Sequence, residues 1–161
     1  MVSYSTNLMA PAPPPSELTS HLGYWLRYVS NHVSQAFARR VEGEGVTVAE
    51  WVMMRQLYGE DALAPSRLAE RVGQTKGAIS KLSERLLAKG LIVRTKDEAD
   101  GRAHFLALSE QGRALIPKLS ALADQNDAEF FGHLTPAERA TVQRVMKDIV
   151  ERRDLKGIPT S

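Results

Sequence analysis

The sequence predicts a mainly α-helical fold with one small β-hairpin and long helices at both ends. Three observations support this fold class. Apolar residues recur at intervals of three and four along six stretches, which is the pattern of amphipathic helices. Between the fourth and fifth stretches, residues 91–108 read as strand, turn and strand, with Asp100-Gly101 as the turn signal. A chain of 161 residues, 43% of them hydrophobic, can form one compact domain or two closely joined halves.

Capping residues and glycines set the helix boundaries. Thr47 with Glu50, and Thr135 with Glu138, have the spacing of capping boxes, in which each residue bonds the backbone of the other. Gly73 suits the left-handed position that follows a helix. The predicted helices are residues 16–43, 47–58, 65–72, 75–89 and 109–133, and a last helix that starts at 135. Residues 1–15 end in a proline-rich run and are expected to form an extended or disordered tail.

The fourth helix combines an apolar face with a basic face of small residues. Ile79, Leu82 and Leu86 share the apolar face, so the polar side chains point elsewhere. Such a helix, placed before a hairpin, is typical of a DNA-binding domain whose second helix enters the major groove. We expect base contacts from Lys76, Ser80 and Lys81, phosphate contacts from Thr75 and Ser66, and Ala78 and Arg85 at the same surface.

Basic residues are concentrated in this part of the chain. Residues 65–102 hold nine basic and five acidic residues, whereas the whole chain has a net charge of only +2. Local charge density governs attraction to a polyanion such as DNA. At the tip of the hairpin, Arg102 is expected to enter or border the minor groove, with Asp100 holding its guanidinium in position. A basic face that is merely solvated is the alternative.

The predicted helices at both ends of the chain carry more apolar surface than a small DNA-binding domain between them can cover. We therefore expect residues 47–108 to form a winged helix-turn-helix DNA-binding domain, residues 16–46 and 109–155 to form a helical dimerisation region, and residues 156–161 to be a tail. A two-fold dimer would place two recognition helices about 34–36 Å apart, which suits a palindrome in double-stranded DNA. A monomer whose terminal helices fold back as an extra layer is the alternative.

Several function classes lack their signatures. The chain has no cysteine, which excludes disulfides and thiolate metal sites. The four histidines have no close spacing, so no metal site is expected unless distant helices supply its ligands. No phosphate-binding loop or nucleophile motif is present, and we expect neither an enzyme nor a cofactor. No apolar run approaches 18 residues and the N-terminus lacks a signal pattern, so we expect no membrane association and a cytoplasmic location.

The order of elements and several short motifs resemble the MarR family of winged helix-turn-helix regulators. The resemblance runs from Ser16 to Arg153 and is most specific in residues 68–72, 78–86, 89–94 and 106–112. The wing of the family usually reads Asp-Arg-Arg; Asp100 and Arg102 match its ends, but Gly101 replaces the middle arginine. The resemblance implies a homodimeric transcription factor, often a repressor, whose DNA binding is loosened by a small aromatic acid or phenol.

Aromatic and polar residues at helical spacing predict where such an effector binds. The predicted pocket is lined by Trp25, Tyr28, His32, Trp51 and Arg55, with Tyr24 nearby. The rings suit a flat ligand, and the Arg55 guanidinium suits a carboxylate. The alternative is that both tryptophans are core anchors and that Arg55 is solvated.

Two hypotheses from different classes follow. The first is a ligand-responsive DNA-binding regulator, expected to be a repressor. The second is a helical protein-interaction or adaptor module that keeps the winged fold without reading DNA. Salt dependence separates them, because phosphate contacts weaken steeply with added salt and an apolar interface does not.

Overall fold

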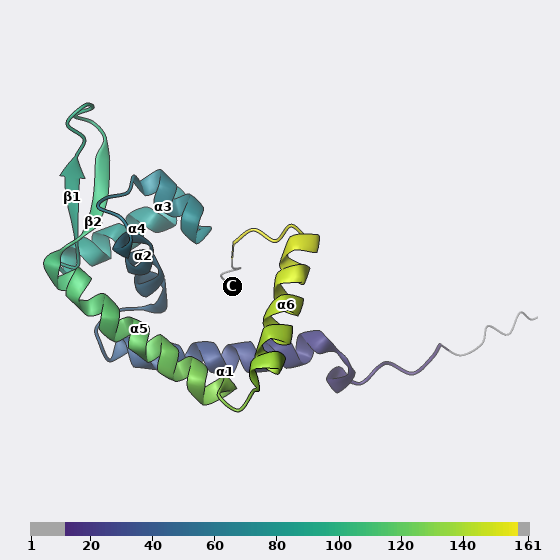
Figure 1. Cartoon of the computed structure of the whole chain (residues 1–161). Helices are drawn as coiled ribbons and strands as arrows, with labels where there is room; N and C mark the ends of the chain where they lie inside the picture. Colours follow the sequence, from purple (N-terminus) through teal and green to yellow (C-terminus); the bar gives the residue numbers. More distant parts are fainter. Residues whose placement is uncertain (1–11, 158–161) are drawn as a thin grey trace, which may run out of the picture. The chain divides into compact units, whose positions relative to one another are not determined.

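The computed structural model describes residues 12–157 and confirms the mainly helical fold with one hairpin (Figure 1). The elements are a 3₁₀ turn η1 (Leu18–Ser20), α1 (Leu22–Glu42), α2 (Val48–Tyr58), α3 (Pro65–Val72), α4 (Lys76–Ala88), β1 (Ile92–Lys96), β2 (His104–Leu108), α5 (Glu110–Phe131) and α6 (Pro136–Arg152). The described chain divides into two compact units between His32 and Val33. Most of the predicted tails, residues 1–11 and 158–161, lie outside the described residues.

The predicted capping signals are confirmed. The Thr47 hydroxyl accepts the Glu50 N–H at 3.2 Å, and the Glu50 carboxylate accepts the Thr47 N–H at 2.9 Å. Thr135 and Glu138 form the second capping box. There the backbone N–H and then the hydroxyl of Thr135 donate to the Glu138 carboxylate and lower its pKa. Gly73 adopts the left-handed conformation, with φ 67°. These features could be predicted from the sequence because each depends on residues within four positions of a helix end.

The first helix begins later than the sequence predicts, at Leu22 rather than Ser16. Residues before it form the short turn η1, and His21 is extended. The Ser20 hydroxyl donates to the Glu17 carbonyl at 2.6 Å, and a ring nitrogen of His21 lies 3.0 Å from the same oxygen. Side chains that bond nearby backbone groups compete with the helix for those groups. This competition explains the delayed start.

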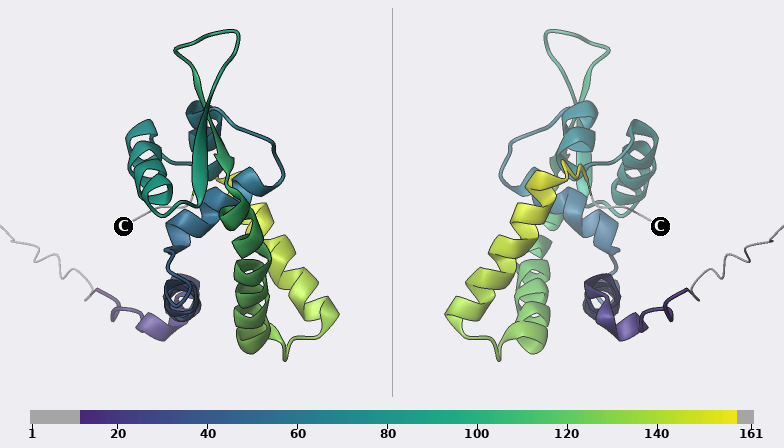
Figure 2. Two further views of the ribbon diagram at one scale, coloured as in Figure 1. Left: turned by 90° about the vertical axis from the view of Figure 1, so that its left-hand side faces the viewer. Right: turned by 90° about the vertical axis from the view of Figure 1, so that its right-hand side faces the viewer.

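The hairpin pairs β1 and β2 in antiparallel register from Ile92↔Leu108 to Lys96↔His104. Leu63, before α3, bridges Leu106 through two backbone bonds of 2.8 and 2.9 Å. Figure 2 shows the hairpin projecting beyond the helices and ending in a wide loop. This loop, residues 97–103, is longer than the predicted tight turn.

The turn at the tip also differs from the prediction. Asp100-Gly101 favours a turn with positive φ, but Gly101 does not adopt positive φ. Instead the Asp100 carbonyl accepts the Ala103 N–H at 2.9 Å, which places Gly101 and Arg102 at the centre of the turn. The Asp97 carboxylate accepts the Ala99 N–H at 2.9 Å and stabilises the preceding bend. Side-chain bonds to the backbone therefore set the shape of the wing.

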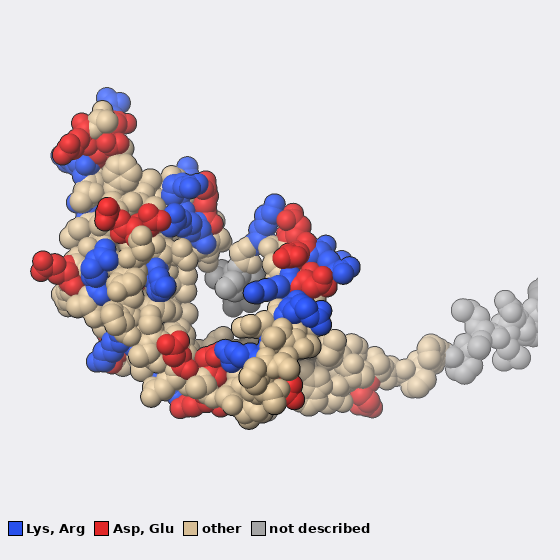
Figure 3. All heavy atoms as spheres, in the orientation of Figure 1, with Lys and Arg blue, Asp and Glu red and all other residues tan. Residues whose placement is uncertain are grey.

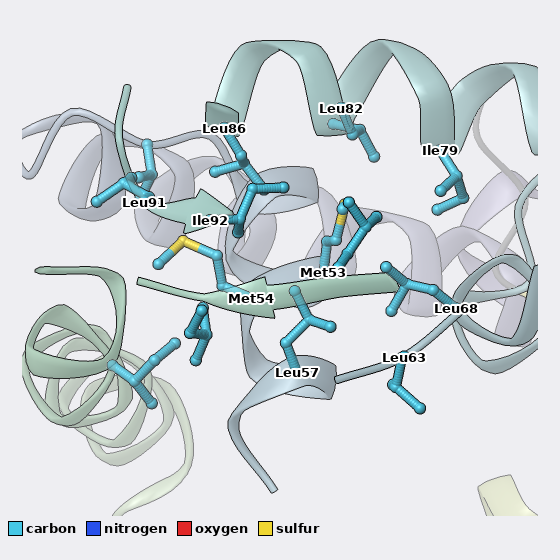
Figure 4. Close-up of a cluster of buried hydrophobic side chains, with 14 of the residues drawn as sticks. Met53, Met54, Leu57, Leu63, Leu68, Ile79, Leu82, Leu86, Leu91 and Ile92 are labelled. Carbon is cyan, nitrogen blue, oxygen red and sulfur yellow. The ribbon is translucent and has the colours of Figure 1, made fainter. Parts of the chain in front are cut away.

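One hydrophobic core fixes the orientation of α4 (Figure 4). Ile79, Leu82 and Leu86 of α4 are buried, as their spacing predicts. They face apolar side chains from α2, from α3 and the segment before it, and from the start of the hairpin, namely Met53, Met54, Leu57, Leu63, Leu68, Leu91 and Ile92. Because one face of α4 is held in this core, the opposite face is directed to solvent.

Two helices keep apolar side chains exposed. On α6, no residue is buried, and the exposed apolar side chains are Val142, Val145, Met146, Ile149 and Val150. In the first unit, Leu22, Trp25, Leu26 and Val29 are also exposed. Among the described residues, no helix has the length and apolar character needed to cross a membrane.

Candidate DNA-binding interface and ligand cavity

The polar face of α4 presents most of the predicted contact residues to solvent. Lys76, Ser80, Lys81 and Arg85 are exposed, whereas Ala78 is partly buried. Thr75 is the N-cap, and its hydroxyl oxygen accepts the Ala78 N–H at 3.1 Å. The hydroxyl proton of Thr75 remains available for a phosphate oxygen. Ser66 is exposed in the first turn of α3.

Ion pairing divides the nine basic residues of the 65–102 window into two groups. Four are paired: Arg67 with Glu70, Arg71 with Glu60, Lys89 with Glu50 and Arg94 with Glu84. The other five, Lys76, Lys81, Arg85, Lys96 and Arg102, have no acidic partner within 4.0 Å in the described part of the chain. These five lie on α4 and the wing. An unpaired cation keeps its full charge for phosphate, so this group is the candidate DNA-binding surface.

The wing is electrostatically mixed. Asp97, Glu98 and Asp100 lie in the loop with Arg102, and Figure 3 shows acidic and basic side chains together at the tip. The Asp100 carboxylate accepts the backbone N–H of Arg102 at 3.1 Å. Within the described residues it makes no ion pair with the Arg102 guanidinium, contrary to the prediction. The short aspartate side chain bonds the nearer amide two residues on, which closes the turn and leaves the guanidinium free.

Replacing Gly101 with arginine is expected to strengthen DNA binding. An added Cβ meets nothing within 4 Å, and the backbone has no positive φ, so the fold accepts the side chain. One more phosphate contact would raise affinity by about 1 kcal/mol and steepen the salt slope by about 0.9. Salt titrations of binding measure both quantities. Gly101→Ala is the matched control, since it adds the Cβ without charge. Equal affinity of Gly101→Arg and Gly101→Ala would mean that the wing tip does not reach DNA.

The five predicted effector residues fall in different units. Trp25, Tyr28 and His32 belong to the first unit, where the Tyr28 and His32 rings meet edge to face at 4.8 Å. In the second unit, Trp51 is half-buried, with its ring 6.5 Å from that of Phe37. Arg55 is exposed, with its guanidinium 5.7 Å from the centre of the Tyr58 ring. The alternative thus holds in part: Trp51 is half-buried beside the core and Arg55 is exposed, but Trp25 is 49% exposed and is no core anchor.

A cavity of about 230 Å³ lies between α1, α2 and α5 in the second unit. Its lining residues are Val33, Ser34, Phe37, Val48, Ala123, Asn126 and Asp127, none of which was predicted. Asn126 is buried; its amide Nδ2 donates to the Val33 carbonyl at 3.2 Å, and its Oδ1 has no partner among the described residues. The sequence held one signal: Asn126 continues the apolar row of Leu115, Leu119 and Leu122 on α5. A polar residue in such a row must find a polar partner.

Comparison with known proteins finds a family model and relatives that this chain resembles. The model of the MarR family matches residues 44–103. A putative transcriptional regulatory protein for the hcr operon of Thauera aromatica is 28% identical over 131 residues, covering 81% of this chain and 79% of the relative. Among residues 12–157, no group of three metal-ligating side chains is placed to hold a metal ion.

Solved structures share the fold. A mutant of MarR from Escherichia coli in complex with operator DNA matches with a TM-score of 0.72 and 21% identity, covering 80% of this chain and 93% of that one. BpsR of Bordetella bronchiseptica, whose DNA binding is regulated by 6-hydroxynicotinic acid, matches with a TM-score of 0.74 and 24% identity, covering 84% and 97%. The family model matches the winged helix-turn-helix region, and the similarity to the Thauera aromatica protein extends over most of the chain. Together these matches support a winged-helix transcriptional regulator of the MarR type.

Proposed function

We propose that this regulator is a repressor that binds a palindromic DNA site as a homodimer and releases it when a small phenolic ligand binds. The observation that carries the DNA-binding part is that, within residues 65–102, the five basic side chains without an acidic partner all lie on α4 and the wing. Lys76, Ser80 and Lys81 would contact base edges, Thr75 and Ser66 phosphates, and Arg102 the groove beside them. Ala78 and Arg85 border this surface on α4.

Lys81→Ala tests this assignment. If Lys81 contacts a base, its loss should weaken binding to a duplex selected from random sequences by the unmodified protein by about 1–3 kcal/mol. Lys147→Ala, on exposed α6, removes the same charge elsewhere and should have little effect. The adaptor hypothesis expects both variants to bind the duplex equally weakly. It would be supported if the affinity of the protein for its partner did not change with added salt.

The dimer part of the proposal rests on exposed apolar side chains. Apolar rows of this length on α6 and in the first half of α1 are rarely left in contact with water. A second copy of this chain could cover these rows and would also supply a second recognition helix for a palindrome. We propose repression because a dimer seated on a site near a promoter blocks access to it.

The cavity supports a phenol rather than a carboxylate as the effector. No basic residue lines it, and Arg139, outside the lining, is already paired with the Asp127 carboxylate, so a ligand carboxylate would lack a counterion. The orphan Asn126 Oδ1 is an acceptor, and the hydroxyl of a phenol is a donor. The ring of such a ligand would lie against Phe37.

Phenol and benzoate are matched probes for this site. We expect phenol to raise the melting temperature by mass action and to weaken DNA binding, with both effects lost in Asn126→Leu. A coupling of about 1–3 kcal/mol between ligand and DNA is ordinary. Ligand-free DNA binding should stay intact. A response to benzoate that disappears in Arg55→Ala would instead place the effector at Trp25, Tyr28, His32, Trp51 and Arg55, the set predicted from the sequence.

A further inference from the structure

An ion pair between the buried Glu50 and the exposed Lys89 joins the end of the recognition helix to the start of α2. Glu50 is fully buried, and its Oε2 accepts from the Lys89 ammonium at 2.7 Å as well as from the Thr47 N–H at 2.9 Å. The Lys89 ammonium also donates to the Gly45 carbonyl at 2.8 Å. Lys89 is the C-cap residue of α4. Two hydrogen bonds therefore tie this helix end to residues 45–50.

The turn that follows Lys89 is held from a second side. The Ser109 hydroxyl donates to the Gly90 carbonyl at 2.6 Å, and the Ser109 N–H donates to the Leu91 carbonyl at 3.1 Å. Gly90 has φ +68°, which turns the chain sharply from α4 towards β1. The C-terminal end of α4 is thus fixed by α2 on one side and by the first turn of α5 on the other.

The charge on Glu50 is not needed for its capping role. A capping box works with glutamine as well as glutamate at this position, and burial of a carboxylate costs free energy unless a cation compensates. Neither exposed nor buried ion pairs add much net stability on average, so fold stability alone does not explain this half-buried pair. A charged pair also restricts the position of the helix end, because the Lys89 ammonium must stay within hydrogen-bond reach of two fixed acceptors.

We propose that Lys89 and Glu50 are positioning residues that set the pose of the recognition helix. The pair fixes the C-terminal end of α4 against α2, and so determines how Lys76 and Lys81 are presented to the groove. Lys89 acts through this pair and does not contact phosphate. This inference rests on the proposed DNA binding. It implies that Lys89, although one of the basic residues in the 65–102 window, does not belong to the DNA-contacting surface.

A double-mutant cycle with salt titration tests the proposal. The proteins are the unmodified chain, Glu50→Gln, Lys89→Met and the double variant, bound to the selected duplex. We expect each single change to weaken binding by about 5- to 150-fold, the range of ordinary coupling between sites. The double variant should bind more tightly than the two losses combined predict. The salt slope should stay unchanged in all four, and Lys89→Arg should restore affinity, because a guanidinium can also donate to both acceptors.

A phosphate contact by Lys89 gives a different set of results. The salt slope would fall by about one in Lys89→Met, Glu50→Gln would bind as tightly as the unmodified protein, and the double variant would match Lys89→Met. Any of these results would overturn the proposal. Arg102→Ala is the positive control for a change in slope. Should Lys89→Met fail to fold, as melting curves would show, the nearly isosteric Glu50→Gln decides. Failure of the unmodified protein to bind DNA would reject the proposed function itself.

Discussion

Replacing Gly112 with alanine is expected to destabilise the folded protein by about 1–3 kcal/mol or more. This range is the usual cost of inserting a group into a packed site. A Cβ at this position would lie 2.0 Å from the carbonyl oxygen of Leu91 and 2.9 Å from its carbonyl carbon. Both are backbone atoms. The same carbonyl accepts the Ser109 N–H at 3.1 Å, so it cannot move away without losing that bond.

Thermal unfolding measures this effect. For a chain of this length, 1 kcal/mol corresponds to about 2–4 °C in melting temperature. Gly23→Ala is the matched control, because Gly23 lies inside α1 with nothing within 4 Å of an added Cβ. Alanine there should leave stability unchanged or raise it by up to about 1 kcal/mol. If Gly112→Ala melted at the temperature of the unmodified protein, the first turn of α5 would have to pack against Leu91 differently in solution.

The sequence predicted the local features of this fold well. The capping boxes at Thr47 and Thr135, the left-handed Gly73 and the buried row on α4 were all read correctly. Each depends on residues within one or two helical turns of one another. Helix spacing and capping chemistry act at that range, so one sequence contains the information.

Features that depend on distant residues were missed. Glu50 and Lys89 are 39 positions apart, and nothing in the sequence distinguishes Lys89 from the free cations of the same window. The cavity draws residues from three helices that lie far apart along the chain, so the predicted effector set did not include its lining. The wing turn failed for a local reason: the Asp97 and Asp100 carboxylates bond the backbone and outweigh the preference of Asp-Gly for a tight turn.

Replacing Val142 and Met146 together with glutamate is expected to abolish the proposed dimer and, with it, tight DNA binding. The two side chains lie one turn apart on the exposed apolar row of α6 and are each 45% exposed in the single chain. Two charges on each copy would have to be buried to form the same interface, which is prohibitive without partners. A monomer binds one half of a palindrome and loses the effective concentration that links the two halves. The expected fall in affinity is about 100- to 10,000-fold.

Sedimentation and binding to two duplexes separate this cause from a local defect. The double variant should sediment as a monomer and bind the full palindrome no more tightly than a single half-site, because its recognition helix is untouched. Ala140→Glu is the matched control, since it adds one charge to the same helix about 160° away from Val142. That control should remain dimeric. A variant that stayed dimeric would move the interface off α6, and a monomer that bound the palindrome as tightly as the unmodified protein would reject the dimeric mode of reading.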